Sequence, residues 1–178
     1  MSRFVALLRG INVGGRTLKM ADLRAVVEDA GGTDVATYIQ SGNVVLSHSM
    51  RSPDRLAAHL AGAIEEATGM AIPVIARTTK EWDAVVQANP FPAAGGTTLH
   101  VVFLDQPPGP DAFGDLDLAS FAPEECTVVG RELYLYLPNG MGRSPLAIEL
   151  AKRSHPMAVG TSRNWNTVLT LHDMVRSS

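Results

Sequence analysis

The three residues Ser41-Gly42-Asn43 constrain the fold more than any other feature, because they separate two strand-like segments by very little chain. The segments 34–40 and 44–48 are rich in the β-branched and aromatic residues that favour strands. So short a connection joins antiparallel strands, whereas parallel strands need a crossover of a dozen or more residues. The first half of the chain is therefore predicted to contain an antiparallel hairpin.

Strands and helices are predicted on both sides of this hairpin. The strongest helix signal begins at a Ser-Pro pair and carries an apolar stripe at Leu56, Leu60, Ile64 and Ala67. The order is βαββαβ, which is the ferredoxin-like split pattern and predicts an α+β subdomain over residues 1–78. The expected elements outside the hairpin are a strand at 3–9, helices at 20–32 and 52–69, and a strand at 72–78.

The second half also mixes strands and helices, in a pattern consistent with a degraded copy of the first. Thr78 and Glu81 have the spacing of a capping box at the start of a helix. We expect residues 79–178 to form a second, smaller α+β subdomain that packs closely on the first. Its expected elements are helices at 78–88, within 108–121, at 144–152 and from 164 onward, and strands at 98–105 and within 126–138.

Composition excludes several classes of protein. The net charge of −3 offers no global attraction for nucleic acid. A single cysteine, Cys126, allows no intramolecular disulfide, and a reducing cytoplasm is the simplest location. No segment approaches the roughly 18 apolar residues of a membrane helix. The histidines show no metal-ligand spacing, so neither a metal nor a cofactor is expected.

The segment "GINVGGRT", residues 10–17, nearly matches the phosphate-binding loop G-x-x-x-x-G-K-[ST]. Gly10, Gly15 and Thr17 fit the spacing, but Arg16 stands in the place of the lysine. The following hairpin conflicts with the parallel sheet of P-loop proteins. The next helix is also predicted to begin near Met20, too late for its N-terminus to hold a phosphate. A nucleotide-hydrolysing P-loop is therefore disfavoured.

Two interpretations of this loop remain open. In the first, Gly10, Gly14 and Gly15 supply positive φ angles and Asn12 caps a turn, as such residues commonly do. In the second, backbone N–H groups form an anion-binding nest, with Arg9 and Lys19 as charged donors. Both readings need the same flexible backbone.

The turn "QSGN" adds Gln40, Ser41 and Asn43. Serine and asparagine are common in turns because their side chains hydrogen-bond to the nearby backbone, but this does not explain a glutamine at the end of a strand. In a βαββαβ sheet the first strand ends where the third begins. The glycine-rich loop and this turn are therefore predicted to share one edge of the sheet, which brings Arg9 and Asn12 near Gln40 and Asn43.

A third polar group lies near the C-terminus, in "SRNWNT". Arg163, Asn164 and Asn166 are predicted at the start of a helix, together with Trp165. One interpretation is that Asn164 caps the helix and the tryptophan belongs to the core. The other is that the arginine and the free N–H groups bind an anion. If the last helix folds back on the first subdomain, this group would complete the same cleft.

The motifs "LLRGINVGG…LKM", "YIQSGNVV", "NPF" and "TSRNWNTV" occur here in one order. In this the chain resembles a bacterial family catalogued as domain of unknown function sixteen ninety-seven, from Phe4 to the last helix. The resemblance implies two α+β subdomains, the first of them ferredoxin-like, and it brings no established activity. Members of the family often carry lysine at the position of Arg16, and the segment "KRSHPMAVG" departs from their usual pattern.

These patterns favour a protein that binds a small anionic ligand, for example a phosphorylated one, in a cleft lined by the three polar groups. They do not decide between an enzyme and a binding protein. An alternative is a protein-interaction module, since Tyr134 and Tyr136 alternate on a strand and can face a partner. A nucleic-acid-binding module is less favoured, because the central strands lack the aromatic residues on which bases stack.

Overall fold

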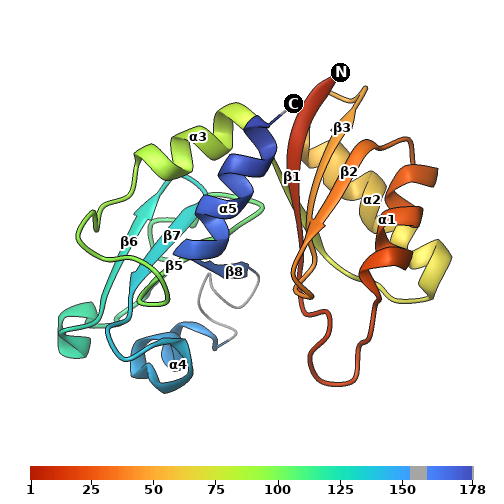
Figure 1. The fold of residues 1–178 in the computed structure, drawn as a ribbon. Coiled ribbons are helices and arrows are strands. Elements are labelled where there is room, and N and C mark those ends of the chain that lie inside the picture. The colour runs from red at the N-terminus through yellow and green to blue at the C-terminus, as the bar shows by residue number, and fades with distance from the viewer. Residues whose placement is uncertain (153–159, 178) are drawn as a thin grey trace. The chain divides into compact units, whose positions relative to one another are not determined.

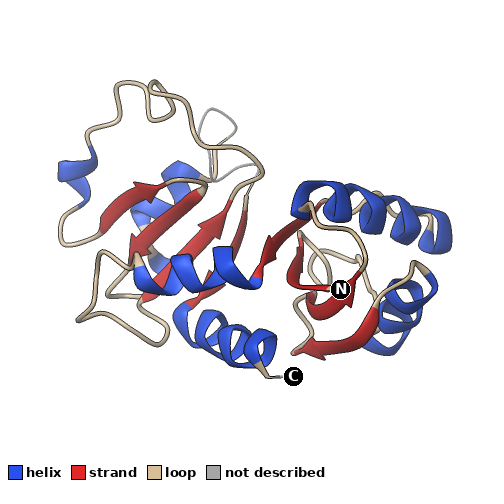
Figure 2. Ribbon diagram, turned by 90° about the horizontal axis from the view of Figure 1, so that it is seen from above, coloured by secondary structure: helices blue, strands red, loops and turns tan. Residues whose placement is uncertain are grey.

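The computed structural model describes residues 1–152 and 160–177, so most of the segment "KRSHPMAVG" lies outside the described residues. The chain divides into two compact units. Unit 1 comprises Met1–Ala84 and Leu171–Ser178, and unit 2 comprises Val85–Thr170. Each unit has its own four-stranded antiparallel sheet with helices alongside it (Figures 1 and 2). The predicted α+β class is confirmed.

Unit 1 contains the predicted βαββαβ order of elements. Its sheet has the strand order β2-β3-β1-β4, and every neighbouring pair is antiparallel. The predicted hairpin joins β2 to β3, with Tyr38 opposite Asn43. The elements are β1 (Ser2–Leu8), α1 (Met20–Asp29), β2 (Thr33–Tyr38), β3 (Asn43–His48), α2 (Pro53–Thr68) and β4 (Val74–Thr78).

The core of unit 1 lies between the sheet and the helices α1 and α2, which cover the same face of it (Figure 1). Alternate residues of β1, such as Phe4 and Leu8, point to this core because side chains alternate along a strand. In α2 the stripe is buried at Leu56, Leu60 and Ile64 but not at Ala67, which is exposed. Each buried leucine or isoleucine contributes about 1.5–3 kcal/mol.

Local signals fix the ends of the helices as the sequence predicts. The Ser52 hydroxyl accepts a hydrogen bond from the Arg55 N–H at 3.3 Å, and α2 ends at Gly69, whose φ is 71°. α3 (Thr79–Gln87) begins at a capping box. The Glu81 carboxylate accepts from the Thr78 N–H at 2.8 Å, and the Glu81 N–H donates to the Thr78 hydroxyl at 3.2 Å.

Unit 2 repeats the topology of unit 1. Its strand order, β6-β7-β5-β8, is antiparallel throughout and places successive strands as β2-β3-β1-β4 does. The suggested copy of the first half is therefore present in the strand order. The elements are β5 (Leu99–Phe103), η1 (Leu118–Phe121), β6 (Glu125–Val129), β7 (Glu132–Tyr136), η2 (Met141–Arg143), α4 (Pro145–Leu150), β8 (Thr161–Asn164) and α5 (Trp165–Arg176).

One element of unit 2 is mispredicted from the sequence, and another is missed. The helix predicted within 108–121 is only the 3₁₀ turn η1, because prolines and glycines interrupt the segment before it. β8 was not predicted at all, since its sequence Thr-Ser-Arg-Asn is short and polar.

The core of unit 2 is formed by one face of its sheet and by α4, with Val102, Leu135 and Leu146 among its buried residues. Tyr134 points to the other face, where its hydroxyl donates to the Val85 carbonyl at 2.6 Å. This tyrosine is 1% exposed, so it is not available to a partner.

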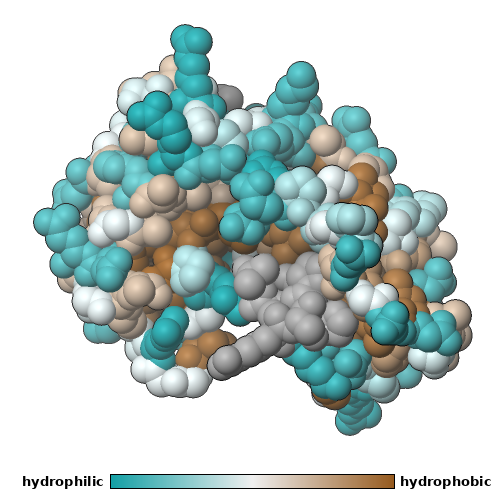
Figure 3. Space-filling view, turned by 180° about the vertical axis from the view of Figure 1, so that it is seen from behind, coloured by the Kyte–Doolittle hydropathy of each residue, from teal (hydrophilic) through white to brown (hydrophobic). Residues whose placement is uncertain are grey.

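Most of the side chains that project from the surface in the view of Figure 3 are hydrophilic. No helix among the described residues has the length and apolarity needed to cross a membrane.

The last residues of α5 belong to unit 1. The guanidinium group of Arg3, on β1, donates to the carbonyls of Val175 and Met174 at 3.1 and 3.2 Å. It thereby satisfies carbonyls that the end of a helix leaves without partners. Asp83 of α3 accepts hydrogen bonds from His172 and Arg176, each at 2.8 Å. The last residues of α5 are thus tied to β1 and to α3 within unit 1.

Candidate functional site

The glycine-rich loop follows β1 and folds into a tight turn. Arg16 donates its N–H to the Val13 carbonyl at 3.3 Å and accepts from the Asn12 N–H at 2.6 Å. Between them, Gly14 and Gly15 have φ angles of 59° and 90°. Two consecutive positive φ angles define the primed turns that glycine tolerates best. Both glycines therefore have the positive φ angles that the first interpretation predicts for them.

The Asn12 side chain joins this loop to the turn between β2 and β3. Its amide nitrogen donates to the Leu18 carbonyl at 3.1 Å and to the Gln40 carbonyl at 2.6 Å. Its amide oxygen accepts from the Leu18 N–H at 2.9 Å. The loop and the turn thus meet at one edge of the sheet, and Asn12 holds them there through all its polar atoms.

The turn between β2 and β3 contains two residues with structural roles and two that are exposed to solvent. Gly42 has a φ of 75°, and its carbonyl accepts from the Leu8 N–H at 2.8 Å. Asn43 is 0% exposed and donates to the Tyr38 carbonyl at 3.0 Å, which favours a structural role over ligand binding. Gln40 and Ser41 are exposed at the turn.

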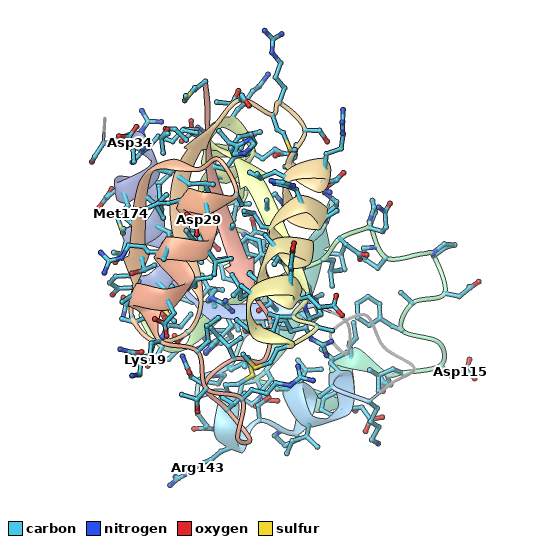
Figure 4. The ribbon with its side chains drawn as sticks, turned by 90° about the vertical axis from the view of Figure 1, so that its right-hand side faces the viewer. Lys19, Asp29, Asp34, Asp115, Arg143 and Met174 are labelled. Carbon is cyan, nitrogen blue, oxygen red and sulfur yellow. The ribbon has the colours of Figure 1, made fainter. Side chains whose placement is uncertain are left out.

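The edge formed by residues 9–19 and 39–43, called the basic edge below, carries three cations and no carboxylate. Arg9 is half-buried, and Arg16 and Lys19 are exposed. Lys19 lies immediately before the first turn of α1 and makes no side-chain cap there (Figure 4). The first carboxylate along the chain is Asp22, in that first turn. The edge therefore carries a net positive charge.

The equivalent edge of unit 2 has the opposite charge. The loop that follows β5 carries the exposed residues Asp105, Asp111, Asp115 and Asp117 and no lysine or arginine (Figure 4 labels Asp115). Its backbone makes the matching contact, because the Leu104 N–H donates to the Arg131 carbonyl at 3.0 Å as Leu8 does to Gly42. The turn between β6 and β7 adds one cation, Arg131, whose guanidinium donates to the Asp105 carbonyl at 3.1 Å. One topological position therefore has three cations and no carboxylate in unit 1, and four aspartates with one arginine in unit 2.

The sequence predicts Arg163 at the start of a helix, but the residue belongs to β8, and α5 begins only at Trp165. It is 7% exposed and donates to the Thr161 hydroxyl at 2.7 Å and to the Ser162 carbonyl at 2.8 Å. Burial lowers the pKa of Arg163 to about 10, which leaves it charged at neutral pH.

The rest of this group surrounds the start of α5 in unit 2. The Asn164 amide oxygen accepts from the Thr167 N–H at 2.9 Å, which is the capping role that the first interpretation assigned to it. Trp165 is buried, and Asn166 is exposed beside Gly96. Since this group belongs to unit 2 and the basic edge to unit 1, a cleft shared by both stays a prediction.

Two concavities contain none of the predicted residues. One, of about 460 Å³ in unit 1, is lined by Val26, Asp29, Ala30, His59, Ala63, Glu66 and Ala67. The other, of about 280 Å³ in unit 2, is lined by Phe91, Pro92, Ala93, Ala94, Glu125 and Tyr136. The "NPF" motif was the signal available for the second, which sequence reasoning missed. Within residues 1–152 and 160–177, no three histidine, cysteine or acidic side chains cluster as metal ligands do.

The fold and the basic edge define an α+β protein in which one antiparallel topology occurs twice. The chain belongs to the family described as "Protein of unknown function (DUF1697)", which matches residues 1–134. It is also similar to the conserved bacterial protein SP0830 from Streptococcus pneumoniae. That similarity covers 99% of each chain at 19% identity with a TM-score of 0.77, and it shows a common fold. No curated protein matches the chain.

Proposed function

We propose that the basic edge of unit 1 binds a small anionic ligand, for example a phosphorylated one. The observation that carries this proposal is the charge contrast between equivalent edges of the two units. A chain with a net charge of −3 has Arg9, Arg16 and Lys19 at this edge, whereas its counterpart has four aspartates and one arginine. A shared topology does not require that difference, so it points to a role of the edge in unit 1.

The chemistry of the basic edge suits an anion. Arginine can pair with a carboxylate or phosphate through two parallel hydrogen bonds, and lysine adds a point charge. Loops with positive φ angles turn successive N–H groups toward one side, which favours negatively charged guests. In this proposal Arg16 and Lys19 contact the ligand, Gln40 and Ser41 add uncharged hydrogen bonds, and Asn12 positions the loop.

Titration with inorganic phosphate and with glucose 6-phosphate, followed by backbone amide shifts in NMR spectra, tests the proposal. We expect saturable shifts in residues 10–19 and 40–42 and weaker binding at higher salt, since exposed charges are screened. Replacing Arg16 and Lys19 together by glutamine should weaken binding by about tenfold or more, because charge-assisted hydrogen bonds are lost.

The matched control is Arg143→Gln, which removes an exposed cation from unit 2 and should leave the affinity unchanged. The proposal is wrong if neither anion shifts residues 10–19, or if residues 104–117 respond as strongly as the basic edge. It is also wrong if the double variant binds as tightly as the natural chain.

A further inference from the structure

The pocket of about 280 Å³ in unit 2 is built from the loop after α3 and from two strands. The Asn89 carboxamide oxygen accepts from the Phe91 N–H at 2.8 Å, and the Ala94 N–H donates to the Phe91 carbonyl at 3.0 Å. These bonds fold the loop into a fixed turn that presents the phenyl ring. The pocket belongs to unit 2, so it is distinct from the basic edge of unit 1.

Two aromatic rings form one wall of this pocket. The ring centroids of Phe91 and Tyr136 are 6.1 Å apart, and their planes are inclined by 30°. Aromatic faces carry a negative electrostatic potential, and they attract cations placed within about 6 Å of the ring centre. The wall therefore favours a positively charged guest over a neutral or negative one.

Glu125 adds a full negative charge beside the rings. It lies directly opposite Tyr136 in the register of β6 and β7, so both side chains leave the same face of the sheet. In the described part of the chain, Glu125 has no ion pair, and no lysine or arginine lines the pocket. Its neighbour Glu124 differs, since that carboxylate is buried and bonded to Ser144 and Leu146.

We propose that this pocket binds a small organic cation, namely a guanidinium compound with a short alkyl chain. A planar guanidinium group stacks on aromatic faces and pairs with a carboxylate through two hydrogen bonds. An anion would be repelled by Glu125, and a neutral alkyl group would cover this carboxylate without pairing it. The pocket volume of about 280 Å³ lies just below the range of about 300–1,000 Å³ that is usual for ligand pockets, and it suits a guest of this small size.

Two ligands of nearly the same shape test the proposal: n-butylguanidinium and its uncharged analogue n-butylurea. Each is titrated into the full chain while the side-chain and amide NMR signals of Phe91, Ala94 and Tyr136 are followed. We expect n-butylguanidinium to shift these signals saturably and to bind about tenfold or more tightly than n-butylurea, because only the cation pairs with the carboxylate.

Variants separate the charge from the rings. Glu125→Gln should reduce the affinity for n-butylguanidinium to that for n-butylurea, whereas Asp115→Asn, an exposed carboxylate outside the pocket, should leave it unchanged. Tyr136→Leu keeps the charge but removes one ring, and it should weaken binding of the cation severalfold. Circular dichroism confirms that each variant is folded.

Equal binding of the two ligands would overturn the proposal. So would the absence of any shift at Phe91 and Tyr136 up to the solubility limit of the n-butylguanidinium salt. Unchanged affinity in a folded Glu125→Gln variant would overturn it as well. None of these results bears on anion binding in unit 1, so the two proposals fail separately.

Discussion

Gly42 lies where the turn between β2 and β3 contacts the end of β1, and it has two reasons to be glycine. Its φ of 75° falls in the left-handed region. A Cβ atom built there would lie 2.7 Å from both the Leu8 Cβ and the Ile11 Cδ1. Gly14, in the neighbouring loop, has a φ of 59° but nothing within 4 Å of such a Cβ. A comparison of Gly42 with Gly14 therefore separates the energetic cost of backbone strain from that of steric conflict.

Alanine at these two positions should therefore have different effects. We expect Gly14→Ala to lower the free energy of unfolding by about 1 kcal/mol, which is the cost of left-handed backbone. Gly42→Ala should lower it by about 3 kcal/mol, because overpacking adds to that cost. Urea denaturation of both variants measures the difference, and equal losses would contradict the steric argument.

The helix α4 shows how a short element depends on one buried side chain. With six residues it is too short to be stable by itself. The Glu124 carboxylate accepts from the Ser144 hydroxyl at 3.0 Å and from the Leu146 N–H at 2.9 Å. The Ser144 hydroxyl in turn accepts from the Ala147 N–H at 2.8 Å. The start of α4 thus meets negative charge where the helix dipole is positive.

Replacing Glu124 by alanine should lower the free energy of unfolding by about 2–3 kcal/mol, because it leaves buried donors at the start of α4 without an acceptor. Glu125→Ala is the control next to it, since that side chain is exposed, and it should change stability by less than about 0.5 kcal/mol. Thermal unfolding of the two variants checks this. Similar losses in both would show that α4 does not depend on the buried carboxylate.

At the scale of the whole molecule, the chain leaves unit 1 through α3 and returns to it through α5. Asp83, on the first of these helices, bonds to His172 and Arg176 on the second, across 89 and 93 residues of sequence. Mainly through the hydrogen bond from Arg176, the pKa of Asp83 lies below its ordinary value of 3.8. A carboxylate with a lowered pKa in the folded state stabilises that state only while it is ionised.

Asp83→Asn should therefore destabilise the protein at neutral pH, and the difference from the natural chain should shrink as the pH falls below 3.8. The sign follows from the lowered pKa, because the natural chain loses this stabilisation as Asp83 becomes protonated. Asp173→Asn, at an exposed carboxylate on α5, serves as the control. Unfolding curves at several pH values test this, and a difference that stays constant with pH would refute it.

The sequence predicted best the elements whose signals are local. Ser52 and Gly69 mark the ends of α2, and Thr78 and Glu81 mark the start of α3, because capping uses residues three or four positions apart. β8 was not predicted because its four residues form a strand through pairing with β5 and not through their own strand propensity. Arg163 was misplaced for the same reason, since its strand was not foreseen.

The basic edge could be predicted only in part. The meeting of the loop with the "QSGN" turn followed from the βαββαβ order, and the contact between Asn12 and Gln40 lies at that edge. The pocket beside Phe91 could not be foreseen, because Glu125 and Tyr136 are brought to it by the register of β6 and β7. Register is set by the packing of whole strands and not by any one residue.

By itself the sequence determined the α+β class, the hairpin at Ser41-Gly42-Asn43 and most helix ends, since each depends on hydrogen bonds and side-chain patterns between near neighbours. The sequence suggested that the second half copies the first, but the tertiary structure alone decided that the two strand orders match. It also decided that matching edges carry opposite charge, and that Glu125 lies beside two aromatic rings. These features join residues that are distant along the chain, and only the burial of a common core brings them together.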